Sequence, residues 1–318
     1  MASTKVVLVT YDRFLLLRFA GNYLCMRIVV TGSLGNISKP LTIALVQKSH
    51  DVTVITSNIS KRQEIEALGA QAAIGKVDDA DFLTGIFQGA DLVYCMIPPD
   101  FSVDDPIARY QRIGNSYAKA IRNAGVKRVI HLSTYGAHLY AGTGLISGSN
   151  RVEAILDGLG IQLTHMRPTF FYYNLFTLIG MIKAVGYMGN VYGGNDKLAM
   201  VSPVDIADAI VDEIENPAGS AVRYVGSDDR SCNEVAKVLG TAIGMPDLEW
   251  RTLTKEQVLT SLVNNGHSED VAHHLLELGE AIHTGRLREE YDKNKPTLGR
   301  VKLEDFAVEF AKMFNNGE

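Results

Sequence analysis

The fold is decided by residues 27–38, which read RIVVTGSLGNIS. The β-branched run at 28–30 predicts a short strand, and the apolar spacing of residues 39–48 predicts a helix after it. Between them, Gly32 allows a tight turn and Gly35 lets the main chain come close to a ligand. Amides left free at the start of the helix would stabilise an anion such as a diphosphate. The residues predicted to form this anion site are Gly32, Leu34, Gly35, Asn36 and Ile37.

The glycine spacing is G-x-x-G-x-x-S, with Ser38 where a dinucleotide-binding turn usually has a third glycine. Two glycines at this spacing also close ordinary surface turns, so the surrounding sequence has to decide between the two interpretations. Predicted strands at 52–56, 70–74 and 91–97 alternate with predicted helices at 61–68 and 81–88. Such an alternation builds a parallel sheet whose ligands lie beyond the carboxyl ends of the strands. The context therefore favours dinucleotide binding.

The expected fold class is α/β, a doubly wound parallel Rossmann sheet with a smaller C-terminal α/β lobe. We expect the dinucleotide-binding domain at 26–175, with later elements near 201–227 rejoining it, and the smaller lobe at 176–318. The segment 187–200, rich in Gly and Asn, is expected to be a loop over the cleft. Residues 1–25 contain no glycine turn and make an incomplete signal peptide, so they are predicted to be an extension outside the domain.

Composition excludes several other classes of protein. With 31 Lys and Arg against 36 Asp and Glu, the net charge of −5 argues against a duplex nucleic-acid footprint. No apolar run approaches the ~20 residues of a membrane span. The three cysteines, Cys25, Cys95 and Cys232, lie far apart and indicate neither a disulfide framework nor a zinc site. We therefore expect a cytoplasmic protein with no metal, no nucleic-acid partner and no membrane partner.

The end of the second predicted strand indicates which dinucleotide is bound. Asp51 precedes that strand and lies too far from the adenosine ribose to bind it. The carboxyl end instead carries donors and cations that suit a 2′-phosphate, namely Ser57, Asn58, Ser60, Lys61 and Arg62. The prediction is NADP(H), in preference to NAD(H). In the alternative interpretation, Lys61 and Arg62 are only the exposed first turn of a helix. Ile97 and Pro98, after the fourth strand, are expected to contact the ribose and diphosphate through shape and carbonyls.

A resemblance to a known family becomes visible farther along the chain. It rests on KRVIHLSTYGAH at 127–138, LTHMRPTF at 163–170 with Asn174, VSPVDIA at 201–207 and TLGRVKLEDF at 297–306. Together with the glycine turn, these segments resemble the NmrA-like family, an atypical branch of the short-chain dehydrogenases/reductases. The resemblance implies a domain that binds NAD(P)(H) and a lobe that closes over the nicotinamide. Some members resemble reductases of quinones or dyes, and others are redox-sensing regulators.

Typical short-chain dehydrogenases transfer a proton through a Tyr and a Lys four residues later. The expected positions fall near Leu145 and Ser149, and the pair formed by Tyr291 and Lys295 is interpreted as a surface coincidence. The candidate catalytic residues are therefore Ser133, Tyr135 and His138. The candidate substrate pocket is formed by Phe170 and Tyr172, within the aromatic run 170–173, and by Thr169 and Asn174, which flank that run. Core packing between the lobes explains that run equally well.

The predicted function is hydride transfer from NADPH to a small flat acceptor such as a quinone or a dye. For such an acceptor, solvent can supply the proton, so the absence of the Tyr and Lys pair does not exclude catalysis. The alternative is a non-catalytic NADP(H)-sensing protein that acts through a protein partner. The sequence leaves open whether the chain forms a homodimer.

Overall fold

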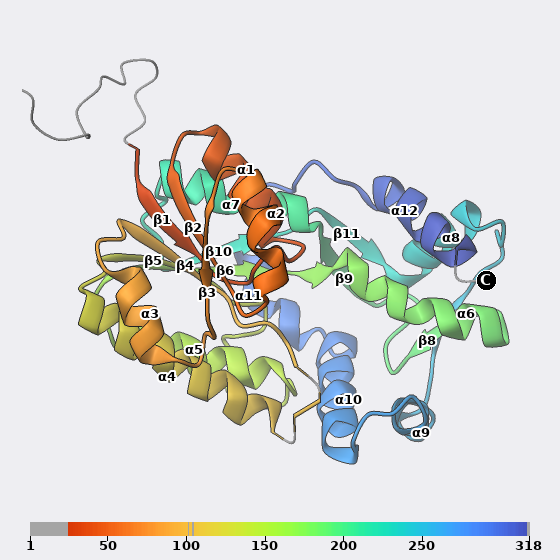
Figure 1. Ribbon diagram of the computed structural model, residues 1–318. Helices are drawn as coiled ribbons and strands as arrows, with labels where there is room; N and C mark the ends of the chain where they lie inside the picture. Colours follow the sequence, from red (N-terminus) through yellow and green to blue (C-terminus); the bar gives the residue numbers. More distant parts are fainter. Residues whose placement is uncertain (1–24, 101, 104, 317–318) are drawn as a thin grey trace, which may run out of the picture.

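The computed structural model describes residues 25–100, 102–103 and 105–316, so the predicted N-terminal extension lies almost wholly outside the described residues. A seven-stranded sheet forms one side of the molecule, and a second group of elements packs at one end of it (Figure 1). The strand order is β10-β6-β5-β4-β1-β2-β3, and every neighbouring pair is parallel. The strands of this sheet are β1 (Arg27–Val30), β2 (Asp51–Thr56), β3 (Gln71–Ile74), β4 (Leu92–Cys95), β5 (Arg128–Leu132), β6 (Gln162–Pro168) and β10 (Val222–Val225).

Helices cover both faces of the sheet, which confirms the predicted doubly wound α/β fold (Figure 1). One face carries α1 (Ser38–Gln47), α2 (Arg62–Ala67) and α7 (Pro203–Glu215), and the other carries α3 (Ala80–Phe87), α4 (Pro106–Ala124) and α5 (Ile146–Asp157). Each face has its own apolar core, because both sides of a parallel strand are buried and its residues are apolar in succession. In β2, for example, Val54 and Ile55 point to opposite faces and are each at most 1% exposed.

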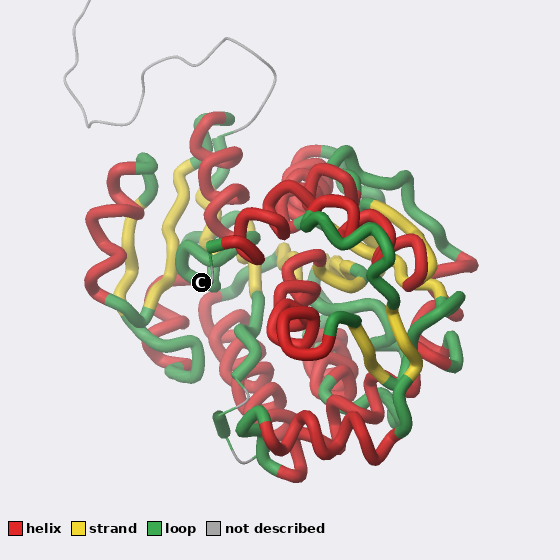
Figure 2. The backbone as a smooth tube through the Cα atoms, turned by 90° about the vertical axis from the view of Figure 1, so that its right-hand side faces the viewer, coloured by secondary structure: helices red, strands yellow, loops and turns green. Residues whose placement is uncertain are grey.

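The second group of elements forms its own core beside the carboxyl end of the sheet (Figure 2). It contains the three-stranded sheet β11-β9-β7 and the two-stranded sheet β12-β8. Its strands are β7 (Phe170–Phe171), β8 (Met188–Asn190), β9 (Lys197–Val201), β11 (Asp228–Ser231) and β12 (Trp250–Thr252). Its helices are α6 (Ile179–Val185), α8 (Cys232–Ala242), α9 (Lys255–Asn264), α10 (Glu269–His283), α11 (Glu289–Lys293) and α12 (Leu303–Asn315).

The prediction of a loop at 187–200 is wrong, since β8 and most of β9 lie there. The residues Leu198 to Val201 are each at most 2% exposed, and β9 pairs antiparallel with β11. These strands exist because of partners distant in sequence, which local Gly and Asn content does not reveal.

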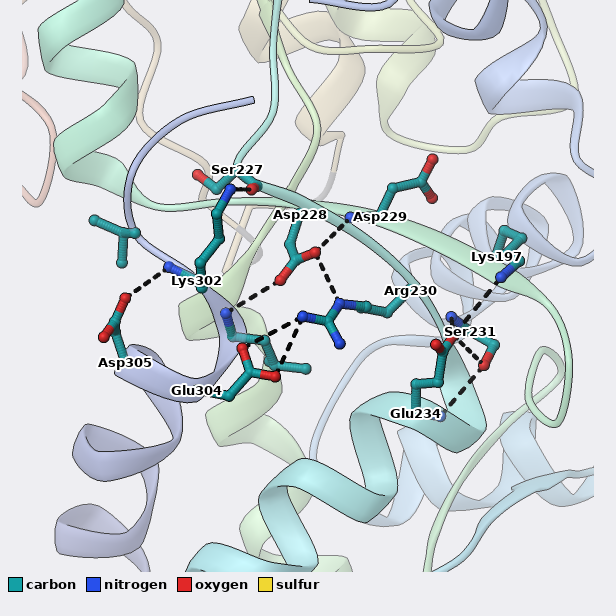
Figure 3. Close-up of polar contacts among 12 residues, drawn as sticks. Lys197, Ser227, Asp228, Asp229, Arg230, Ser231, Glu234, Lys302, Glu304 and Asp305 are labelled. Carbon is teal, nitrogen blue, oxygen red and sulfur yellow. Dashed lines mark hydrogen bonds and ion pairs between the residues drawn. The ribbon is translucent and has the colours of Figure 1, made fainter. Parts of the chain in front are cut away.

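A polar cluster fastens the C-terminal segment to both parts of the molecule, and Figure 3 shows the contact of Lys302 with Ser227 in it. Asp205, at the start of α7, is 4% exposed and accepts hydrogen bonds from Ser227 Oγ at 2.5 Å and from the amide of Val301 at 3.1 Å. Lys302 Nζ donates to the carbonyl oxygens of Ser227 at 2.8 Å and Gly299 at 2.7 Å. The segment before α12 is thereby held against the connection from β10 to β11.

Candidate functional site

The turn between β1 and α1 has the geometry that its glycines predict. Gly32 has φ +91°, and a Cβ placed there would lie 2.7 Å from both Met96 Sδ and Ser38 Oγ. Ser38 is 1% exposed, and its hydroxyl donates to the carbonyl oxygen of Thr31 at 2.9 Å. A serine therefore fits in place of the usual third glycine, because its small side chain also satisfies the end of the strand.

The amides at the start of α1 are available to a ligand. Among the described residues, the main-chain amides of Leu34, Asn36, Ile37 and Ser38 donate to no acceptor. The first turn of α1 also contains no acidic side chain, so nothing there repels an anion. A Cβ added at Gly35 would meet only the carbonyl oxygen of Gly32, at 3.2 Å, and the rest of its surroundings are open. The donor set and the space fit a diphosphate.

Ser33 links this turn to the end of β2. It has φ +57°, a left-handed conformation that is uncommon for a residue with a side chain. Its amide donates to the carbonyl oxygen of Ile55 at 3.0 Å, and its hydroxyl donates to Thr56 Oγ1 at 2.9 Å. Backbone strain of this kind persists where the surroundings hold it, and it is frequent at ligand sites.

The carboxyl end of β2 carries the expected polar residues, and Asn58, Ser60, Lys61 and Arg62 each have a local partner. Asn58 accepts from the amide of Ser60 at 3.0 Å and so begins the short helix that leads into α2. Lys61 Nζ lies 2.8 Å from Glu64, and Arg62 Nη1 lies 3.7 Å from Glu66. Both cations remain more than 40% exposed, so they can exchange these partners for a phosphate.

Glu64 also pairs with Lys39, and hydrogen bonds from Lys39 and Lys61 lower the pKa of its carboxyl to about 2. Asp51 stands at the opposite end of β2, where it is exposed and accepts from Gln71 Nε2 at 2.9 Å. The segment directly beyond β2, residues 57–62, contains no acidic residue.

The loop after β4 is held by α4. The carbonyl oxygen of Pro98 accepts from Arg109 Nη1 at 2.8 Å, and that of Ile97 accepts from Tyr110 at 3.5 Å. Within the described residues each of these carbonyls accepts one hydrogen bond, so any contact with a ligand uses a second lone pair or the apolar surface of the loop.

The three candidate catalytic residues occupy different surroundings. Ser133 Oγ donates to Glu153 Oε1 at 2.5 Å, so its hydrogen is already committed. Tyr135 is 6% exposed within the core of the C-terminal lobe, and burial raises the pKa of its phenol, which makes it a weaker acid. Both ring nitrogens of His138 are buried without a hydrogen-bond partner in the described part of the chain, and burial lowers its pKa.

Thr134 lies between these residues and differs from them. It is half-buried, and its hydroxyl has no hydrogen-bond partner within residues 25–100, 102–103 and 105–316. Because side chains alternate along an extended segment, Thr134 faces the opposite way from Ser133. The sequence shows three polar side chains in succession here, and only the fold separates the committed hydroxyl from the uncommitted one.

The aromatic run after β6 divides between two environments. Phe170 packs against the core of the C-terminal lobe, where Tyr172 is 1% exposed and stacks on Phe306 with 5.2 Å between ring centroids. Phe171 instead packs on the core beneath α1, and it stacks on Tyr173 at 5.0 Å. This packing argues against Tyr172 as a pocket residue and favours the half-buried pair Phe171 and Tyr173.

The pair formed by Phe171 and Tyr173 lies close to the end of β4. Burial raises the pKa of Tyr173 to about 12, and Tyr110 of α4 contributes electrostatically to the shift. Tyr173 in turn contributes electrostatically to raising the pKa of Tyr94 in β4. The hydroxyl of Tyr94 is buried without a hydrogen-bond partner among the described residues. The other two pocket candidates differ from each other, since Thr169 is 2% exposed and Asn174 is half-buried.

The interpretation of Tyr291 as a surface residue is wrong. It is 1% exposed and packs edge-on against Tyr224, with 5.9 Å between ring centroids. Lys295 lies 3.2 Å from Asp229, so its ammonium group is neutralised by that carboxylate. Sequence reasoning also missed the buried ion pair of Glu153 and Arg167, in which Arg167 Nη2 lies 2.5 Å from Glu153 Oε2. An acidic residue on an otherwise apolar face of a helix is the signal that could have indicated it.

In the part of the chain that the structure describes, no group of three or more His, Cys, Asp or Glu could hold a metal ion. None of the helices in residues 25–100, 102–103 and 105–316 is both long and apolar enough to cross a bilayer.

Several known proteins are similar to this chain. The chain is 26% identical to the NAD(P)H azoreductase of Xenophilus azovorans over 257 residues, 79% of this chain and 85% of that protein. It superposes with a TM-score of 0.71 on the NADP(H) complex of the Citrobacter sp. triphenylmethane reductase, at 19% identity, covering 89% of this chain and 99% of that one.

The NADP complex of NmrA, a negative transcriptional regulator, superposes with a TM-score of 0.67 at 14% identity, covering 92% of each chain. At these identities the two solved structures establish the fold alone, which enzymes and regulators share. The model of the NmrA-like family matches residues 26–307, and the chain therefore belongs to the NmrA-like family.

Proposed function

We propose that the protein is an NADPH-dependent oxidoreductase that reduces a small flat acceptor such as a quinone or a dye. The observation that carries the proposal is the presence, at one edge of the sheet, of a diphosphate-sized set of free amides and a stacked aromatic pair. The amides belong to the turn 32–38, and the pair is Phe171 and Tyr173. Met96 connects them, since it lies beneath Gly32 and packs on the same core as Phe171.

The free amides of the turn would hold the diphosphate, with the partial positive charge of α1 behind it. NADPH, when bound, supplies a hydride, and the acceptor gains two electrons in that transfer. Phe171 and Tyr173 would hold a flat acceptor by stacking, since aromatic faces favour offset parallel contact. With a quinone as the acceptor, Thr134 would donate a hydrogen bond to the oxygen on which negative charge develops. Solvent then supplies the proton, which explains why no Tyr and Lys pair is needed.

NADPH rather than NADH is the preferred cofactor in this proposal. Lys61 and Arg62 stand directly beyond β2 and are both more than 40% exposed. The supporting relatives include an NAD(P)H azoreductase and a triphenylmethane reductase solved with NADP(H). A guanidinium and an ammonium group next to a 2′-phosphate form charge-assisted hydrogen bonds that the NADH hydroxyls cannot reproduce.

The experiment is to follow NADPH absorbance while the purified protein is mixed with quinones, azo dyes, triphenylmethane dyes and aldehydes. The proposal expects turnover with at least one flat acceptor and none with simple aldehydes. Binding of NADPH is measured separately by fluorescence titration. Tight binding without turnover on the whole panel would refute the enzyme and would instead support the NADP(H)-sensing regulator. Absence of binding would refute both.

A further inference from the structure

The carboxylate of Glu153 stands at the centre of a buried polar network. Glu153 lies on α5 and is 6% exposed. Its Oε1 accepts from Ser133 Oγ at 2.5 Å and from Arg167 Nε at 2.9 Å, while its Oε2 accepts from Arg167 Nη2 at 2.5 Å. Arg167 Nη1 donates in addition to the hydroxyl of Tyr224 at 3.1 Å. One carboxylate thus connects α5 with the ends of β5, β6 and β10.

Such a pair is a poor source of stability. Two charges lose their hydration on burial, and apolar residues of similar size are often as stabilising. Removing one partner is costly, however, because it leaves the other charged and buried. The ion pair therefore fixes the positions of the strand ends more effectively than it raises the free energy of unfolding. Its role depends on which residues it holds in place.

The residues it holds adjoin the proposed acceptor site. The amide of Ser133 donates to the carbonyl oxygen of Met166 at 2.8 Å, and that of Tyr135 donates to Pro168 at 3.0 Å. These bonds continue the pairing of β5 and β6 past the end of β5 and place Thr134 between them. Because Glu153 takes the hydroxyl hydrogen of Ser133, the hydroxyl of Thr134 is the one left for a ligand.

We infer that Glu153 is a positioning residue for the acceptor site: by binding Ser133 and Arg167 it fixes the ends of β5 and β6, and thereby the hydroxyl of Thr134. The inference deepens the proposed function and rests on it where turnover is measured. It does not place Glu153 in contact with cofactor or acceptor.

The chain contains a matched control in Glu213. This residue lies on α7, is 1% exposed and accepts from Thr164 Oγ1 at 3.0 Å and Arg223 Nη1 at 3.2 Å. It therefore also pairs with one hydroxyl and one Arg at the edge of the same sheet. Thr164 precedes Arg167 by three residues on β6. Glu213 therefore binds β6 farther from the carboxyl end of the sheet than Glu153 does.

The test compares Glu153→Gln with Glu213→Gln in the full chain. We expect both variants to lower the Tm by similar amounts, because each removes one buried charge. With the acceptor that the wild type reduces, Glu153→Gln should lower kcat by about 30-fold with the dissociation constant of NADPH within about twofold of the wild type. Glu213→Gln should leave kcat within about twofold. Equal losses of kcat in both variants, or an unchanged kcat in Glu153→Gln, would overturn the inference.

Amide hydrogen exchange provides a readout that does not need turnover. Glu153→Gln should accelerate exchange at the amides of Ser133 and Tyr135 by at least about tenfold while leaving those of β2 unchanged. Glu213→Gln should leave the same two amides protected. If the wild type shows no turnover, the proposed function fails, but this exchange result still decides whether Glu153 holds the strand ends. Unchanged exchange at Ser133 and Tyr135 would remove that role.

Discussion

His131 and His165 face each other across the neighbouring strands β5 and β6, with their Nδ1 atoms 2.9 Å apart. Both are 2% exposed, and His165 Nε2 lies 3.2 Å from Asp157. One Nδ1 must donate and the other must accept, so at least one of the two imidazoles is neutral. The lowered pKa of His131 assigns the neutral form to that residue. Burial lowers the pKa of His131 well below its ordinary 6.5, and repulsion from His165 and Arg167 adds to the shift.

Stability should therefore fall in mild acid. His131 gains a proton more readily in the unfolded chain, so its contribution is complete above pH 6.5 and is lost as the pH falls below it. Between pH 7.5 and 5.5 this residue should remove about 1.4 kcal/mol from the free energy of unfolding. Urea unfolding of the wild type and His131→Gln checks this, because the variant should lose that much less over the same interval. Equal pH dependence in both proteins would contradict it.

Gly35→Val should abolish dinucleotide binding without unfolding the protein. The Cβ of the added side chain meets only one backbone oxygen of the free chain, at 3.2 Å, and the side chain would occupy the space that a diphosphate needs. We expect the dissociation constant of NADPH to rise at least about 100-fold, with little change in Tm.

Gly32→Ala is the contrasting variant. Its Cβ would clash with Met96 and Ser38, and alanine resists the left-handed conformation. This variant should have a lower Tm than the wild type and should also bind NADPH more weakly. Retention of NADPH binding by a folded Gly35→Val protein would exclude the turn as the diphosphate site.

Arg62→Ala should reduce the preference for NADPH over NADH by about tenfold, because the 2′-phosphate loses one charge-assisted contact. Fluorescence titration with both dinucleotides measures the ratio. Arg112→Ala serves as the control, since Arg112 is an exposed cation on α4, which covers the opposite face of the sheet from α2. If Arg62→Ala and Arg112→Ala both preserve the ratio, Arg62 does not bind the phosphate.

Tyr173→Leu should raise the KM for a flat acceptor by about tenfold at an unchanged Tm, because it removes a stacking face from the half-buried pair with Phe171. Tyr172→Leu should do the reverse. It removes the contact of Tyr172 with Phe306 inside the core and should cost about 2 kcal/mol in the free energy of unfolding. Steady-state kinetics and thermal unfolding of both variants separate the two roles. A raised KM in Tyr172→Leu alone would reassign the pocket.

The sheet and its glycine turn could be predicted because their signals are local. Apolar runs alternate with helical spacing, and Gly32 and Gly35 stand where the turn needs them. The orientation of single side chains could not be predicted in the same way. Whether Phe170 or Phe171 faces the cofactor edge depends on the pairing of β7 with β9, which starts 26 residues later. The commitment of Ser133 to Glu153 depends on α5, and the burial of Tyr291 depends on the whole C-terminal lobe.

Only Thr169 separates β6 of the large sheet from β7 of the small one. No linker intervenes, so the chain passes from one sheet to the other as a nearly continuous extended backbone. Cutting the polypeptide at this point would place β6 and its parallel neighbour β10 on different fragments and would expose apolar surface on both. The two lobes should accordingly melt together in one cooperative transition, and neither should be recoverable as an independently folding half.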